Sequence, residues 1–243
     1  MDPEKVAYWY LRLNGFLLWE NFYVHPGGGG GALTDADLIG VRFPFRAERL
    51  IDDPEDLMED DVARLGLIST KPDLVMAEVK RGPCALNGPW TDPAKENIQR
   101  VIAAIGCLPT DAVANAGAEI YADGMFENAS VRARLICVGA SINDEMRETS
   151  PAIYQITWSE CLAFIFQRFT KYARQKAQTE LWEQTGRALK TKALSLLDEA
   201  AFVEWATKEM GVSIARVDSQ PHNVAESARP MPQAGSAAKA AKA

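Results

Sequence analysis

The chain has 243 residues and 47% hydrophobic content, which is enough to build one sizeable buried core. It contains no apolar run of about eighteen residues and no apolar stretch directly after its charged first residues, so we expect neither a membrane span nor a signal peptide and predict a soluble, cytoplasmic protein. The net charge of −7 argues against a uniformly basic surface, yet seven of the 33 acidic residues lie within 52–61, and the other 26 match the 26 lysines and arginines.

The N-terminal residues predict a helix followed by a strand. Apolar residues recur at helical spacing over 3–13, and Asn14 and Gly15 are residue types at which helices end. Residues 16–24 are dense in aromatic and branched side chains, as strands are, and a proline and five consecutive glycines follow soon after. We therefore expect a first strand that leads into a flexible connection.

Two further strands are expected to carry charged residues at their ends. Residues 34–43 alternate between two faces, and Asp37 shares its face with two branched apolar residues. Residues 73–81 place Glu78 and Lys80 on one face after an apolar start, which is typical of a central strand.

The rest of the chain predicts helices around two more strands. A capped, amphipathic helix begins at Thr91 or Asp92 and ends before Gly106. The acidic stretch 52–61 is interpreted as a solvated loop or a short helix. The other expected elements are helices at 111–121, from 159 onward and over 177–209, and strands at 131–138 and 153–158.

Together these elements indicate an α/β fold with a central mixed sheet of about five strands flanked by helices. We expect a core domain over 1–175, a helical C-terminal extension over 176–213 and a disordered tail over 214–243, where apolar periodicity fades. The four cysteines stand singly, without the spacing of a zinc site or the density of a disulfide scaffold. We interpret them as small buried apolar residues.

Three charged residues form the candidate catalytic group. Glu78 and Lys80 are two residues apart, so their side chains project from the same face of a strand, and Asp37 can join them if its strand pairs with theirs. Two converging carboxylates make a hard oxygen site that suits Mg²⁺ or Mn²⁺, which can grip a phosphate and lower the pKa of a bound water. Lys80 would then orient that water or help to deprotonate it. The alternative is that Glu78 and Lys80 are only a solvated ion pair where the strand leaves the core.

The order of these segments resembles the PD-(D/E)XK, or restriction-endonuclease-like, superfamily of nucleases. The resemblance covers about residues 3–170 and rests on LNGFLLWENFYV at 13–24, TDADLIGVRFP at 34–44 and DLVMAEVKRG at 73–82. It implies a mixed sheet flanked by helices, with metal bound by Asp37 and Glu78. It also implies that the carbonyl of Val79 is a further ligand and that Lys80 is the catalytic lysine.

The resemblance also draws attention to a glutamate in the first helix. Some members of the superfamily use a glutamate eleven residues before the glycine that opens the first strand, and Glu4 stands at that distance from Gly15. The alternative is that Glu4 is a first-turn acid that interacts favourably with the helix dipole. Asp35 lies on the same strand face as Asp37 and is an alternative carboxylate.

Three other residues near these segments are also candidates for the same site. Asp73 follows a proline, as in the name of the superfamily, but it stands only five residues before Glu78 on the same strand. We therefore interpret Asp73 as a residue that begins the strand. Gln99 or Arg100 of the following helix could approach the site, and an exposed helix face explains them equally well.

The sequence thus predicts a metal-dependent nuclease that cuts DNA phosphodiester bonds through a metal-activated water. Four basic residues are candidate nucleic-acid contacts, and the last three are expected to point away from the core: Arg81, Arg168, Lys171 and Arg174. Two-fold dimerisation would suit double-strand cleavage. Two alternatives stay open, namely a nucleic-acid-binding or regulatory protein that keeps a nuclease-like fold without turnover, and an α/β structural domain whose strand-end charges face water.

Overall fold

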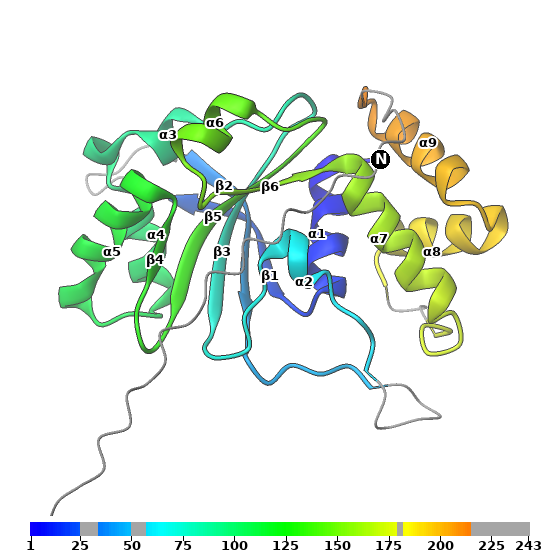
Figure 1. Ribbon diagram of the computed structural model, residues 1–243, viewed down its shortest axis with the longest axis horizontal. Helices are drawn as coiled ribbons and strands as arrows, with labels where there is room; N and C mark the ends of the chain where they lie inside the picture. The colour runs from blue at the N-terminus through cyan, green and yellow to red at the C-terminus, as the bar shows by residue number, and fades with distance from the viewer. Residues whose placement is uncertain (25–33, 50–56, 179–181, 215–243) are drawn as a thin grey trace, which may run out of the picture.

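The computed structural model describes residues 1–24, 34–49, 57–178 and 182–214 and shows an α/β fold built on a mixed sheet (Figure 1). The strand order is β1-β2-β3-β5-β4, and β6 pairs with β5 off this path. Neighbouring strands are antiparallel, except that β3 with β5 and β5 with β6 are parallel. The strands are β1 (Leu17–Val24), β2 (Thr34–Arg42), β3 (Asp73–Val79), β4 (Met125–Glu127), β5 (Arg132–Gly139) and β6 (Tyr154–Thr157). The predicted α/β class and mixed sheet are confirmed.

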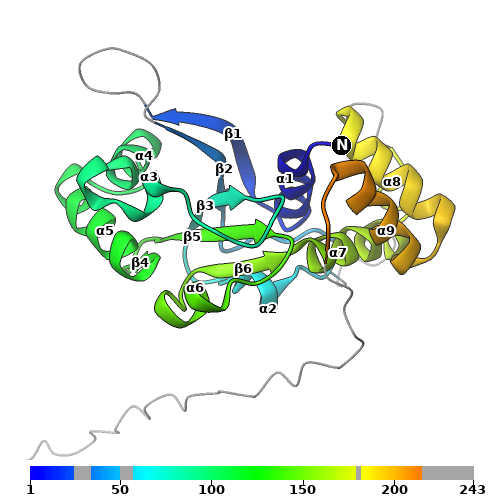
Figure 2. The ribbon, with the colours of Figure 1, turned by 90° about the horizontal axis from the view of Figure 1, so that it is seen from above.

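Helices cover both faces of the sheet, with α4 and α5 on one side and α1 and α7 on the other (Figures 1 and 2). On the central strand β3, Val75 and Ala77 pack into the core shared with α1 and α7, whereas Leu74 and Met76 pack into the core shared with α4 and α5. The helices are α1 (Pro3–Leu13), α2 (Val62–Leu65), α3 (Gly88–Thr91), the short 3₁₀ helix η1 (Pro93–Lys95), α4 (Asn97–Ile105), α5 (Thr110–Asp123), α6 (Asp144–Thr149), α7 (Trp158–Lys171), α8 (Gln184–Leu196) and α9 (Glu199–Met210).

The C-terminal helices α8 and α9 extend the core that lies on the α1 side of the sheet. Leu189 of α8 and Phe202 of α9 are fully buried in the same apolar cluster as Trp9 of α1 and Phe169 of α7. The Trp9 ring also packs against the ring of Trp182, with 4.6 Å between their centroids. No helix in the described ranges is long and apolar enough to cross a membrane.

Two expected helices are each divided in the structure. The helix expected from Thr91 or Asp92 is divided into α3, η1 and α4, because Glu96 adopts a left-handed conformation with φ of 52° and α4 begins only at Asn97. The pattern over 177–209 is divided in the same way at Leu197, where φ is also 52°. Strand β4 was not predicted, because three residues are too few to show an alternation.

Some predictions concern residues that lie outside the described ranges. They are the flexible connection after the first strand, the acidic residues at 52–56 and the disordered tail from residue 215.

Candidate active site

The pairing of β2 with β3 places Asp37 opposite Glu78. Leu38 pairs with Ala77 in antiparallel register, and continuing that register by one residue brings Asp37 opposite Glu78. Directly opposite residues on antiparallel strands have Cβ atoms about 4.5–5.5 Å apart, which is close enough for two carboxylates to share one ion. The Asp37 Oδ2 atom also accepts a hydrogen bond of 2.7 Å from the backbone N–H of Val79. The expectation that these two strands pair is confirmed.

Glu78 is a buried carboxylate held by three donors. Its side chain is 2% exposed. The Oε1 atom accepts hydrogen bonds from Lys80 Nζ and Asn87 Nδ2, and the Oε2 atom accepts one of 2.9 Å from Trp90 Nε1. Burial this deep does not fit the alternative in which the strand-end charges are solvated.

Burial is the main cause of a raised pKa at Glu78. The charge of Asp37 raises that pKa further, whereas the contacts with Lys80 and Trp90 stabilise the ionised form and oppose the shift. The carboxylate therefore sits in an environment that favours a second positive charge beside it, because a cation would offset both the burial and the repulsion from Asp37.

Lys80 is anchored through its backbone and its side chain. Its N–H donates to the carbonyl of Val138 at 2.8 Å, and its own carbonyl accepts from Trp158 Nε1 at 3.0 Å. Its ammonium donates to Glu78 and, at 2.9 Å, to Asn87 Oδ1. Because Asn87 contacts both partners, it fixes the Lys80 head group against Glu78.

Asn87 and Trp90 belong to the site and were missed by the sequence reasoning. They lie on the segment after β3, which folds back so that α3 places Trp90, 3% exposed, in the core beside β3. A signal existed in the sequence, because a buried tryptophan needs a partner for its N–H group and the nearest preceding strand carries Glu78 close to its end. Asn87 carried no comparable signal.

Glu4 lies in the first turn of α1, which packs on the face of the sheet opposite to the one from which Glu78 projects. Lys5, beside it in the first turn of α1, pairs with Glu20 of β1 at 2.6 Å. Glu20 in turn lies opposite Leu38 of β2, the residue next to Asp37. The cap made by Asp2, which accepts from the Glu4 N–H, also fits the alternative in which Glu4 is a first-turn acid.

The structure gives the other candidate residues the following partners. Asp73 begins β3, as interpreted, and binds Arg132 and Arg134. Gln99 packs closely against Gly117 of α5, and Arg100 pairs with Glu96 at 3.8 Å. The backbone of Asp35 pairs with that of Tyr23, two positions further from Glu78 along β2.

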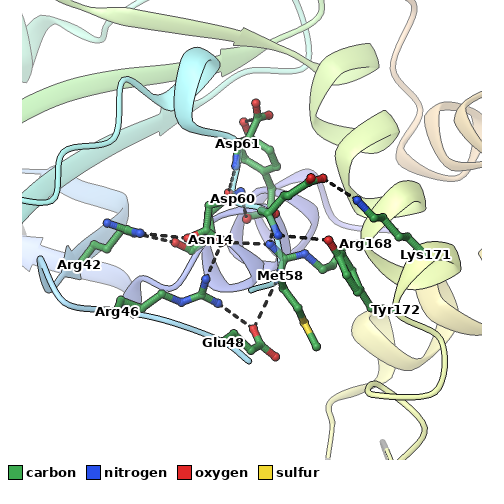
Figure 3. Close-up of polar contacts among 12 residues, drawn as sticks. Asn14, Arg42, Arg46, Glu48, Met58, Asp60, Asp61, Arg168, Lys171 and Tyr172 are labelled. Atoms are coloured by element: carbon green, nitrogen blue, oxygen red, sulfur yellow. Dashed lines mark hydrogen bonds and ion pairs between the residues drawn. The ribbon is translucent and has the colours of Figure 1, made fainter. Parts of the chain in front are cut away.

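The expectation that Arg168 points away from the core is wrong. The described end of the acidic stretch folds onto α7, where the Arg168 side chain is 0% exposed and pairs with Asp60 at 3.0 Å and Glu48 at 3.4 Å (Figure 3). Asp60 also pairs with Arg42 and Arg46 and its side chain is 8% exposed, so it is buried although we expected 52–61 to be a solvated loop or a short helix. The Arg168 guanidinium is inaccessible to a phosphate in this conformation.

The other three basic candidates are exposed at the surface. The Lys171 side chain is 55% exposed and pairs with Glu59 at 2.7 Å, and Arg174 is exposed in the turn after α7. Arg81 is exposed after β3, and its Nη1 group donates to the carbonyl of Met210 at the end of α9.

The residues at this site can supply a small number of oxygen ligands for one hard cation. The described residues contain no group of three or more His, Cys, Asp or Glu side chains that could hold a metal ion. Among these residues, the candidate site therefore has two carboxylates, those of Asp37 and Glu78. Mg²⁺ is commonly held by one or two carboxylates together with water and substrate phosphate, so this donor set fits Mg²⁺ or Mn²⁺. The resemblance to the PD-(D/E)XK superfamily implies a further ligand, the carbonyl of Val79, which lies between Glu78 and Lys80 in the sequence. No protein-family model, curated protein or solved structure matches the chain.

Proposed function

We propose that this chain is a metal-dependent nuclease of the PD-(D/E)XK type that hydrolyses phosphodiester bonds of DNA. The observation that carries the proposal is the register of β2 and β3, which sets Asp37 opposite a buried Glu78 whose nearest cation is Lys80. Two carboxylates can hold a metal ion that activates a water for phosphodiester hydrolysis, and a lysine beside them can stabilise the negative charge that develops.

Asp37, Glu78 and the carbonyl of Val79 would hold Mg²⁺ or Mn²⁺. When bound, the ion supplies a water of lowered pKa and positive charge at the phosphoryl oxygens. Asp37 is oriented for this role by the N–H of Val79, and Glu78 by the indole N–H of Trp90. Such outer hydrogen bonds hold ligand side chains in one geometry.

Lys80 has two roles in this proposal. Without a metal ion its ammonium neutralises Glu78, which makes a buried carboxylate tolerable. With substrate present the ammonium can turn toward the attacking water and the phosphorane-like transition state, where its charge is most stabilising. Asn87 Oδ1 holds the ammonium close to that position.

A cleavage assay tests the proposal. Linear, branched and single-stranded DNA, with matched RNA, would be incubated with Mg²⁺ or Mn²⁺ and the wild-type, Glu78→Gln or Lys80→Ala protein. We expect cleavage by the wild type and a loss of about 100-fold or more in each variant, as for removal of one transition-state contact. Glu145→Gln, a change at an exposed residue of α6, serves as the control. Equal cleavage by Glu78→Gln and wild type would contradict the proposal.

The alternative is a nucleic-acid-binding or regulatory protein without turnover. This alternative is favoured by the hydrogen bonds of Glu78, because both of its carboxylate oxygens already accept from protein donors. Metal titration separates the two functions. A nuclease should bind Mn²⁺ in a way that depends on Glu78, whereas a protein that only uses the Glu78–Lys80 pair to complete its fold should not bind Mn²⁺ there.

A further inference from the structure

A cavity lies where the parallel strands β3 and β5 end. It has a volume of about 500 Å³, and its lining includes Arg81 and Gly82 after β3, Ser141 after β5, and Gly211 and Ser213 after α9. Figure 2 shows the neighbouring parallel strands with their arrowheads pointing the same way, and in open α/β sheets ligands bind outside these carboxyl ends.

The lining of this cavity has the character of an anion site. It contains an arginine and two serines, and none of the described residues that line it is an aspartate or glutamate. Among the described residues no carboxylate pairs with Arg81, in contrast to Lys80 and Lys171, each of which has an acidic partner. Hydroxyl groups and an arginine fork are the usual partners of phosphate oxygens.

The walls of the cavity are held in place. The N–H of Ala140 donates to the carbonyl of Gly82 at 2.7 Å, and the N–H of Cys84 donates to the carbonyl of Ser141 at 2.9 Å. The Arg81 Nη1 group donates to the Met210 carbonyl, which fixes the guanidinium at the rim and leaves its other N–H groups for a ligand. A site that is already shaped costs less entropy on binding.

The chain order then connects this cavity to the catalytic group. Arg81, which lines the cavity, directly follows Lys80, whose ammonium donates to Glu78. We infer that the cavity binds a phosphate group of the same nucleic-acid chain that is cut at Asp37 and Glu78. This inference rests on the proposed function.

The test measures binding separately from cleavage. The Glu78→Gln protein, in the presence of a chelator, would be titrated with fluorescent single-stranded and duplex DNA between about 50 and about 200 mM salt. Adding Arg81→Gln should weaken binding and lower the slope of log affinity against log salt by about one, as for the loss of one phosphate contact. Adding Arg147→Gln, a change at an exposed arginine of α6, should leave the slope unchanged.

A second pair of variants avoids any damage to the fold. A Cβ atom at Gly82 would meet nothing within 4 Å, and its φ lies outside the left-handed region. Gly82→Ala should therefore bind DNA as the parent does, whereas Gly82→Asp should bind more weakly by charge repulsion.

Each outcome decides one claim. An unchanged salt slope in Arg81→Gln, or equal binding by Gly82→Asp and Gly82→Ala, overturns the inference even where the wild type cleaves DNA. A lowered slope supports the inference even where the wild type does not cleave, which would contradict only the proposed hydrolysis. If the parent binds no nucleic acid, both are overturned.

Discussion

Trp90→Phe is the change that best tests whether Glu78 is built to hold a cation. It removes the indole N–H that donates to Glu78 Oε2 at 2.9 Å and keeps an aromatic ring in the core, where Trp90 is 3% exposed. A hydrogen bond to a charged group is worth roughly 1.5–3 kcal/mol, and loss of a partner that orients a metal ligand typically lowers metal affinity about 10- to 100-fold. We expect Mn²⁺ affinity to fall by that factor.

The pH at which Mn²⁺ binding is lost should also shift in a defined direction. Trp90 donates to the ionised carboxylate, so its removal should raise the already raised pKa of Glu78 further. A cation binds the ionised form, so the wild type should lose Mn²⁺ as the pH falls through that pKa, and Trp90→Phe should lose it at a higher pH. Mn²⁺ binding would be followed by electron paramagnetic resonance at a series of pH values.

The control is Trp205→Phe, which changes a tryptophan of α9 that packs against the core on the far side of the sheet. It should leave both the affinity and its pH midpoint unchanged. The reasoning about Glu78 is refuted if Trp90→Phe binds Mn²⁺ with the wild-type affinity and the wild-type pH midpoint while unfolding melts show that it is folded.

Three further predictions concern the stability of the fold. Asp73 is 1% exposed and bound by two buried arginines, so Asp73→Asn should lower the free energy of unfolding by about 3–5 kcal/mol in urea melts, and an unchanged midpoint would contradict this. Although burial alone would raise it, the hydrogen bonds from these arginines keep the pKa of Asp73 below 3.8, so the wild type should lose this stability only as the pH falls below that value. A Cβ atom at Gly186 would come 2.0 Å from the ring of Trp9, so Gly186→Ala should cost about 1–3 kcal/mol, against a smaller effect for Gly82→Ala. The pKa of Glu78 is raised above 4.5, so on acidification the folded chain binds a proton at Glu78 before the unfolded chain does. The free energy of unfolding should therefore gain a contribution from Glu78 as the pH falls toward 4.5. The Glu78→Gln protein should lack this pH-dependent gain.

Much of the sheet was predictable because strand periodicity is local. The strands expected at 34–43 and 131–138 match β2 and β5 to within one residue at each end, and the strand expected at 73–81 ends two residues later than β3. The divided helix after Asp92 was not predictable from its apolar spacing. The left-handed turn at Glu96 interrupts it, and that turn follows a segment whose Trp90 is bound to Glu78.

The candidate site shows the same division. Asp37, Glu78 and Lys80 could be proposed from the alternation of their strands, and the antiparallel register then set the two acids opposite each other. Asn87 reaches Glu78 across nine residues through a chain reversal that has no periodic signal. Arg168 was misjudged because its partners Asp60 and Glu48 lie more than 100 positions away in the sequence.

The sequence by itself determined which residues alternate on each strand and therefore which charges stand at strand ends, because side-chain direction along a strand depends only on neighbouring residues. Only the tertiary structure decided which of those charges are buried, which donors hold Glu78 and which basic side chains remain at the surface. These outcomes depend on contacts between distant segments, and the desolvation of a charge is set by everything packed around it.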